Sequence, residues 1–74
     1  MNEDRLQKAI EALKEVPQDD LAGMDWQLAS HQISIEKMIS ECEKKSCHKQ
    51  AHIARLYYHS MQALRDVIRA ITDE

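Results

Sequence analysis

The sequence has very little of what turns and strands need. Its 74 residues include one glycine and one proline, which disfavours a β-rich fold with many tight turns. It has no phenylalanine and a single tryptophan, so its core must be mainly aliphatic, with methionine contributing. The remaining composition is dominated by strong helix formers such as Ala, Leu, Glu, Lys, Gln and Arg, and it therefore predicts an all-α protein.

Long apolar runs are also missing. The N-terminal stretch MNEDRLQKAI is acidic and amphipathic, without the apolar segment of a signal peptide. No run approaches the roughly 20 apolar residues of a membrane span. We therefore expect a cytoplasmic protein without membrane contact, in which the two cysteines are reduced thiols.

The charge is unevenly distributed along a chain whose length fits a single domain, residues 1–74. The net charge is −3, but residues 1–43 carry four basic and ten acidic side chains, whereas residues 44–74 carry six basic and three acidic ones. Two explanations are open. An acidic segment lies beside a basic one within the fold, or a basic face binds an anionic partner.

A first helix is expected over about residues 3–16. Glu3 and Asp4 suit its first turn, and Pro17 ends it because proline disfavours a helical conformation at the preceding residue. Asp19 or Asp20 can then cap the next helix. The apolar stripe of the first helix consists of Leu6, Ala9, Ile10, Leu13 and Val16.

Two longer helices are expected over about residues 20–44 and 47–72. The apolar pattern breaks around Lys45, where Ser46 suits the N-cap of the last helix, so a tight turn there predicts an antiparallel hairpin. In such a hairpin, residues whose numbers sum to about 91 face each other, for example Met38 and Ile53. This pairing places apolar residues of one helix opposite apolar residues of the other. The two expected stripes are Leu21, Met24, Leu28, His31, Ile35, Met38 and Cys42, and Ile53, Ala54, Tyr57, Met61, Leu64, Ile68 and Ile71.

The predicted architecture is therefore a three-helix all-α protein. A long antiparallel helical hairpin, helices 2 and 3, carries a shorter N-terminal helix packed across it. Helix 2 has a second apolar face that includes Trp26 and Ile33, which either the first helix or a partner covers. Tyr58 is expected on the outer side of helix 3. Trp26, Ile33 and Tyr58 are our candidates for protein contacts, since Trp and Tyr are enriched at binding hot spots.

The stretch CEKKSCHKQAH, residues 42–52, is the one cluster of metal-ligand types. Cys42, Cys47, His48 and His52 read C-x4-C-H-x3-H, and Cys42, Cys47 and His52 are weak zinc candidates. Cys47 and His48 are adjacent, so their side chains diverge by about 100° on a helix. A Cys42–Cys47 disulfide and two free thiols are the other interpretations, and the last is preferred, so no metal is expected.

Basic side chains along helix 3 raise a nucleic-acid alternative. Clustered positive charge suits phosphate, and Tyr58 could stack on a base. The whole chain is acidic, however, and these residues are spread over many positions. This alternative, a nucleic-acid-binding hairpin dimer, would use Lys49, Arg55, Arg65 and Arg69.

Catalysis is not expected. The sequence has no phosphate loop and no nucleophile–base motif, and His31 on an apolar stripe is expected to be a core histidine. We predict no enzyme, no cofactor and no small-molecule substrate.

The small size and the long hairpin of roughly residues 21–72 resemble several groups of helical adaptors. These are plasmid RNA-binding hairpin dimers, small phage-encoded regulators and co-chaperones of type III secretion needle subunits. The resemblance concerns the fold and carries over no functional residue. The expected function is a small non-catalytic adaptor, inhibitor or chaperone-like regulator that binds another protein or itself, as a homodimer.

Overall fold

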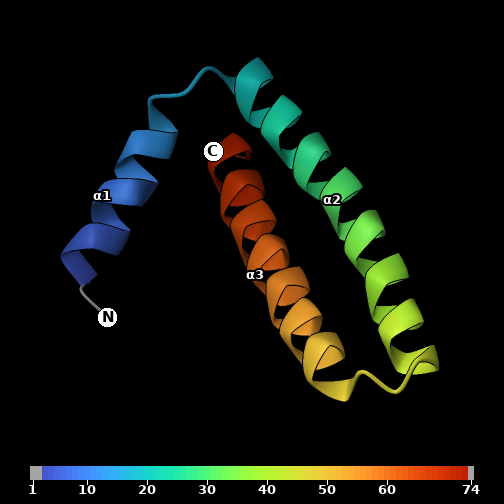
Figure 1. Ribbon diagram of the computed structural model, residues 1–74. Helices are drawn as coiled ribbons and strands as arrows, with labels where there is room; N and C mark the ends of the chain where they lie inside the picture. The colour runs from blue at the N-terminus through green and yellow to red at the C-terminus, as the bar shows by residue number, and fades with distance from the viewer. Residues whose placement is uncertain (1–2, 74) are drawn as a thin grey trace.

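The computed structural model describes residues 3–73, which form three helices and no strand. They are α1 (Glu3–Lys14), α2 (Gln18–Lys44) and α3 (His48–Thr72). Figure 1 shows α2 and α3 running antiparallel, with α1 on the far side of α3 from α2. The predicted all-α, three-helix architecture built on a long hairpin is confirmed.

The connection between α1 and α2 lies two residues earlier than the sequence pattern indicated, at residues 15–17. Helix α1 ends at Lys14, and its last turn tightens through a bond from the Val16 N–H to the Leu13 carbonyl at 3.1 Å. Pro17 then occupies the N-cap position of α2, and its carbonyl accepts from the Leu21 N–H at 3.0 Å. The predicted cap at Asp19 or Asp20 is wrong: both residues lie inside the first turn, where they complement the helix dipole.

The turn between α2 and α3 is a Schellman motif, the usual helix ending in which one residue adopts a left-handed conformation. Ser46 has φ 59°, and its N–H donates to the Glu43 carbonyl at 3.1 Å. The Cys47 N–H donates to the Cys42 carbonyl at 2.7 Å. The prediction that Ser46 caps α3 is therefore wrong, because Ser46 closes α2 and Cys47 holds the N-cap position.

The contact between α2 and α3 follows a regular alternation of four and three residues, typical of coiled coils. We call these positions the seam. Their side chains are buried or half-buried, and they include the most buried apolar residues of the chain, Leu21, Ala51, Ala54 and Ile68. The seam consists of Leu21, Asp25, Leu28, Gln32, Ile35, Ile39 and Cys42 on α2, and of Cys47, Ala51, Ala54, Tyr58, Met61, Arg65, Ile68 and Thr72 on α3.

The predicted apolar stripes differ from the seam by one residue at every second position. Met38 and Ile53, expected to face each other, are both exposed, and so is His31, expected in the core. Gln32 occupies the buried position instead. The cause is physical: polar partners satisfy one another inside the seam, so the most apolar stripe is not the one that is buried.

Helix α1 covers only part of the hairpin. It contacts α3, and in Figure 1 the two helices diverge towards the start of α1. No residue of α1 is fully buried, although Ile10 and Leu13, and Val16 just after the helix, are half-buried. None of the helices within residues 3–73 has the length and apolar character needed to cross a membrane.

The left-handed conformation of Ser46 gives a first prediction. A residue with a Cβ atom in this conformation is strained by roughly 1–2 kcal/mol, whereas glycine is not. Ser46→Gly should raise the free energy of unfolding in urea titration by about 0.5–1 kcal/mol, after glycine's extra flexibility in the unfolded chain is subtracted. Ser40→Gly, in the middle of α2, should lower it by about 0.5 kcal/mol. A destabilised Ser46→Gly protein would contradict the Schellman geometry.

Candidate protein-interaction surfaces

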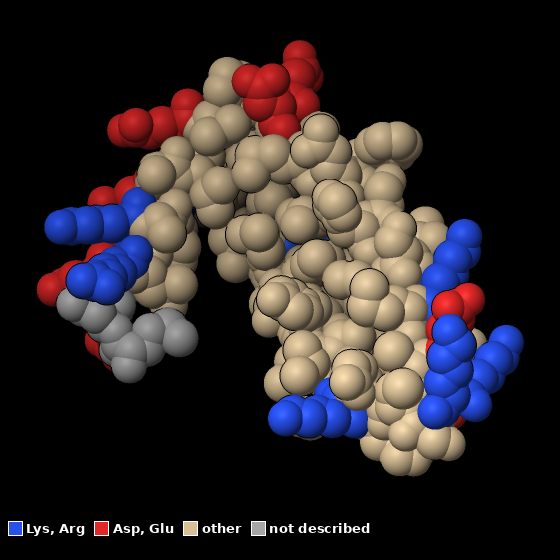
Figure 2. Space-filling model, viewed as in Figure 1, with Lys and Arg blue, Asp and Glu red and all other residues tan. Residues whose placement is uncertain are grey.

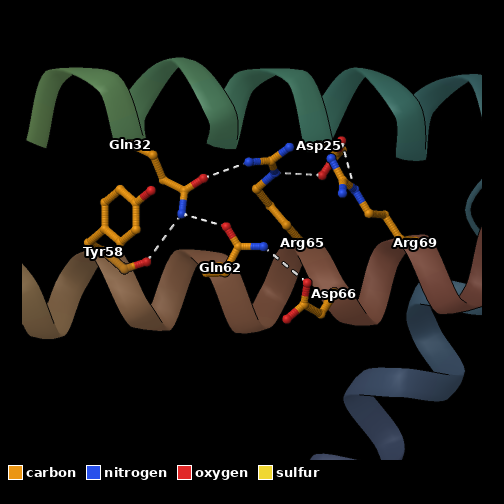
Figure 3. A network of polar contacts seen from close by, with 7 residues as sticks. All are labelled: Asp25, Gln32, Tyr58, Gln62, Arg65, Asp66 and Arg69. Carbon is orange, nitrogen blue, oxygen red and sulfur yellow. Dashed lines mark hydrogen bonds and ion pairs between the residues drawn. The ribbon is translucent and has the colours of Figure 1, made fainter. Parts of the chain in front are cut away.

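A network of polar side chains lies within the seam and fixes how α2 meets α3 (Figure 3). Gln32, only 3% exposed, is at its centre. Its amide nitrogen donates to the Tyr58 carbonyl at 3.3 Å and to the Gln62 Oε1 at 3.1 Å. Its Oε1 accepts a bond from the Arg65 guanidinium at 2.7 Å. The amide therefore has partners on both of its heavy atoms, as a buried amide requires.

Arg65 extends the network to an ion pair. Its Nε donates to Asp25 Oδ1 at 2.8 Å, and the two side chains are 16% and 22% exposed. The Nε of Arg69 lies 3.7 Å from the other carboxylate oxygen. The hydrogen bond from Arg65 is the main reason that the pKa of Asp25 is below its ordinary value, and the Asp25 carboxylate in turn raises the pKa of Arg65.

Tyr58 is part of this contact and not of an outer surface. Figure 3 shows its ring between α2 and α3, and the side chain is half-buried. A hydrogen bond with Glu36 and the charge of that carboxylate raise the pKa of the Tyr58 hydroxyl. The expectation that Tyr58 points outward is therefore wrong. Its polar contacts give Tyr58 a structural role in the contact between α2 and α3.

The arginines proposed for nucleic-acid contact turn toward α2. Arg65 and Arg69 lie beside Asp25, and Arg55 forms an ion pair with Glu43. Lys49 is exposed near the start of α3. Three of the four basic side chains thus already neutralise acidic residues of the same chain, which is the intramolecular explanation of the charge asymmetry.

Trp26 and Ile33 lie on the outer side of α2, 72% and 57% exposed. Ala22 and Ala29 lie on the same helical stripe, one turn from Trp26 on either side. Helix α1 lies beside α3, on the opposite flank of the hairpin, and leaves this stripe open. We call the stripe Ala22, Trp26, Ala29 and Ile33 the Trp26 surface.

A second apolar surface flanks the seam on one side. On α2, Met24, His31 and Met38 each precede a seam position by one residue, as do Tyr57 and Leu64 on α3. In an antiparallel pair, such residues flank the seam on the same side. Figure 2 shows a broad uncharged area over α2 and α3, with charged side chains at its edges. We call its exposed apolar residues the hairpin face: Met38, Ile53, Leu56, Tyr57 and Leu64.

The hairpin face is slightly hollowed. Four side chains of α3, Ile53, Leu56, Tyr57 and Ser60, line a shallow depression of about 240 Å³. Ser60 has the smallest side chain of the four, and its hydroxyl donates to the Leu56 carbonyl at 2.9 Å. An apolar depression of this shape can receive a side chain from another helix.

The cysteine and histidine cluster does not assemble into a metal centre. Cys42 and Cys47 are both free and half-buried at the turn, and His52 is exposed. Within residues 3–73, no three His, Cys, Asp or Glu side chains are arranged to hold a metal ion. The two cysteines occupy the positions of the Schellman motif that are commonly in apolar contact, so packing of the turn explains them.

The network around Gln32 and Arg65 was missed by the sequence patterns, although the four–three spacing of Leu21, Asp25, Leu28 and Gln32 carried the signal. No protein-family model, curated protein or solved structure matches this chain.

Gln32→Ala tests the network directly. The substitution removes one hydrogen-bond partner each from the Gln62 Oε1 and the Arg65 guanidinium, and it opens a cavity between the helices. The free energy of unfolding should fall by about 1–3 kcal/mol. Gln27→Ala is the matched control, because Gln27 is exposed on the same helix. It should change the value by no more than about 0.5 kcal/mol. Equal effects of the two substitutions would contradict the network.

The lowered pKa of Asp25 predicts acid sensitivity. A carboxyl group whose pKa is lower in the folded state stabilises the protein above its unfolded pKa of about 3.9. That stabilisation is lost as the pH falls through the lower, folded value. The free energy of unfolding should therefore decline on acidification from about pH 5 to about pH 2, and Asp25→Asn should make this decline shallower. If the free energy of unfolding of Asp25→Asn declines with falling pH as steeply as that of the wild type, the result would argue against the Asp25–Arg65 pair.

Proposed function

We propose that this chain is a small, non-catalytic protein-binding helical protein of the adaptor, inhibitor or chaperone-like regulator class. The observation that carries the proposal is the Trp26 surface. A tryptophan that is 72% exposed in the middle of a long, well-formed helix leaves its large apolar ring in water. The proposal includes a cytoplasmic location, where the free thiols of Cys42 and Cys47 stay reduced.

The geometry of the Trp26 surface supports helix-in-groove binding. Trp26 and Ile33 are seven residues apart, two turns along one stripe, and the residues between them on that stripe are small. Two large anchors separated by alanine let a partner approach the backbone of α2 closely. Burial of an aromatic anchor at the centre of such a contact commonly contributes most of the binding free energy.

No comparable observation favours the nucleic-acid alternative. Arg55, Arg65 and Arg69 are paired with carboxylates of α2, so a phosphate would have to displace Glu43 or Asp25. Displacing Asp25 would also break the contacts that hold the hairpin together. Protein binding leaves all of these contacts intact.

A photo-crosslinking residue at position 26 tests the proposal in cells of the native host. Trp26 replaced by p-benzoylphenylalanine should yield a discrete crosslinked species that contains a second, different protein. The same probe at Lys37, which is exposed on the same helix, is the control and should not capture that protein. Identical products from positions 26 and 37, or none from position 26, would contradict the proposal.

Stability measurements separate binding from folding at the same position. Because Trp26 is exposed, Trp26→Ser should change the free energy of unfolding by no more than about 0.5 kcal/mol, while the protein captured from position 26 should no longer co-purify with this variant. A much larger loss of stability would show that Trp26 serves the fold of the chain itself.

A further inference from the structure

The chain exposes more surface than a compact protein of its mass. Its accessible surface is 5886 Å² for 8.6 kDa, whereas a folded monomer of that mass typically exposes about 4,700 Å². Its radius of gyration is 14.8 Å, against about 11 Å for a compact domain of 74 residues. The excess of about 1,200 Å² exceeds the roughly 800 Å² that each partner buries in a standard protein interface.

Five of the eight large apolar side chains that are exposed within residues 3–73 lie on one broad side of the hairpin. The hairpin face presents Met38, Ile53, Leu56, Tyr57 and Leu64 to solvent, and α1 covers none of them fully. Fully buried apolar side chains are few and confined to the α2–α3 contact. A helical domain normally buries its apolar faces between two layers, and here the second layer is missing from the described chain.

The charges at the two ends of the hairpin indicate what the second layer is. The connection between α1 and α2 and the first turn of α2 are acidic, with exposed Glu15, Asp19 and Asp20. Exposed Lys44, Lys45 and Lys49 surround the turn between α2 and α3. Figure 2 shows acidic atoms at the upper end and mainly basic ones near the lower end. The uncharged face between them is thus self-complementary once it is turned end over end.

We propose that the hairpin face binds a second copy of this chain, with the two hairpins face to face and antiparallel. The two-fold axis lies in the interface, perpendicular to the long axis of the hairpin. Each basic turn then lies over the acidic connection of the other copy. The four long helices form a four-helix bundle, a common way for helical hairpins to bury a shared core.

The symmetry places a specific residue near the axis. Helix α3 spans His48–Thr72, so Ser60 is at its midpoint, and it is one of the residues that line the depression in the hairpin face. A residue near the two-fold axis meets its own counterpart, and a charge introduced there meets an equal charge. The Trp26 surface lies on the outer side of α2 and stays open in the dimer, so this inference does not depend on the proposed partner.

Sedimentation equilibrium of the purified full chain is the test. The wild-type protein should be a dimer, and Ser60→Glu should raise the dimer dissociation constant by at least about tenfold without loss of helicity. Ser30→Glu, the same change on the exposed outer side of α2, should leave the constant within about threefold. Trp26→Ser should also stay dimeric, so failure of this inference and failure of the Trp26 proposal are distinguishable.

Reversing the charges tests the antiparallel arrangement. Lys45→Glu with Lys49→Glu should weaken the dimer, and so should Glu15→Lys with Asp19→Lys. The combination of all four should restore the dissociation constant to within about threefold of the wild-type value, since opposite charges again meet. If the fourfold variant dimerises as weakly as either double variant, the antiparallel arrangement is overturned.

A wild-type protein that is monomeric at every concentration would overturn the dimer, as would a helical Ser60→Glu protein that dimerises as tightly as the wild type. If Ser60→Glu loses helicity, Tyr57→Gln provides the same comparison, because it removes an exposed ring from the hairpin face without adding charge. Its unchanged dimerisation would then overturn the proposal.

Discussion

A buried amide and a largely buried guanidinium lie between α2 and α3, and each needs partners there. Gln32 and Arg65 find them in one another, in Asp25 and in Gln62. Because polar groups without partners are costly in a low-dielectric contact, the helices meet in the one register that satisfies all four. That register decides which residues flank the seam, and it turns Met38, Tyr57 and Leu64 outward. The apolar surfaces of this protein follow from where its buried polar groups lie.

The helices and the hairpin could be predicted from the sequence because each has a strong local cause. Pro17 separates α1 from α2, and the polar interruption around Lys45 ends the long apolar stripe. The seam itself could not be predicted in the same way. The spacing of the apolar stripes favoured Met24, His31 and Tyr57 over their neighbours Asp25, Gln32 and Tyr58. Asp25 and Arg65 are 40 residues apart, so nothing local shows that each supplies the charge that the other needs.

The difference between the predicted stripes and the observed seam also explains where the candidate surfaces lie. The residues wrongly assigned to the core now make up most of the hairpin face, which sequence patterns had treated as interior. The arginines assigned to an outer basic surface instead neutralise α2, as Glu43–Arg55 and Asp25–Arg65 show. Further exposed acidic and basic side chains lie at the two ends of the hairpin. Of the predicted contact residues, Trp26 and Ile33 are exposed where the proposal needs them, whereas Tyr58 lies in the seam.

Disulfide trapping measures the register of the seam. In a Cys42→Ser/Cys47→Ser background, Ile39→Cys with Ala54→Cys joins two seam positions, whereas Met38→Cys with Ile53→Cys joins two positions on the hairpin face. Mild oxidation followed by mass spectrometry should find an intrachain disulfide in the first pair and none within the chain in the second. An intrachain disulfide between positions 38 and 53, with positions 39 and 54 remaining reduced, would contradict the account.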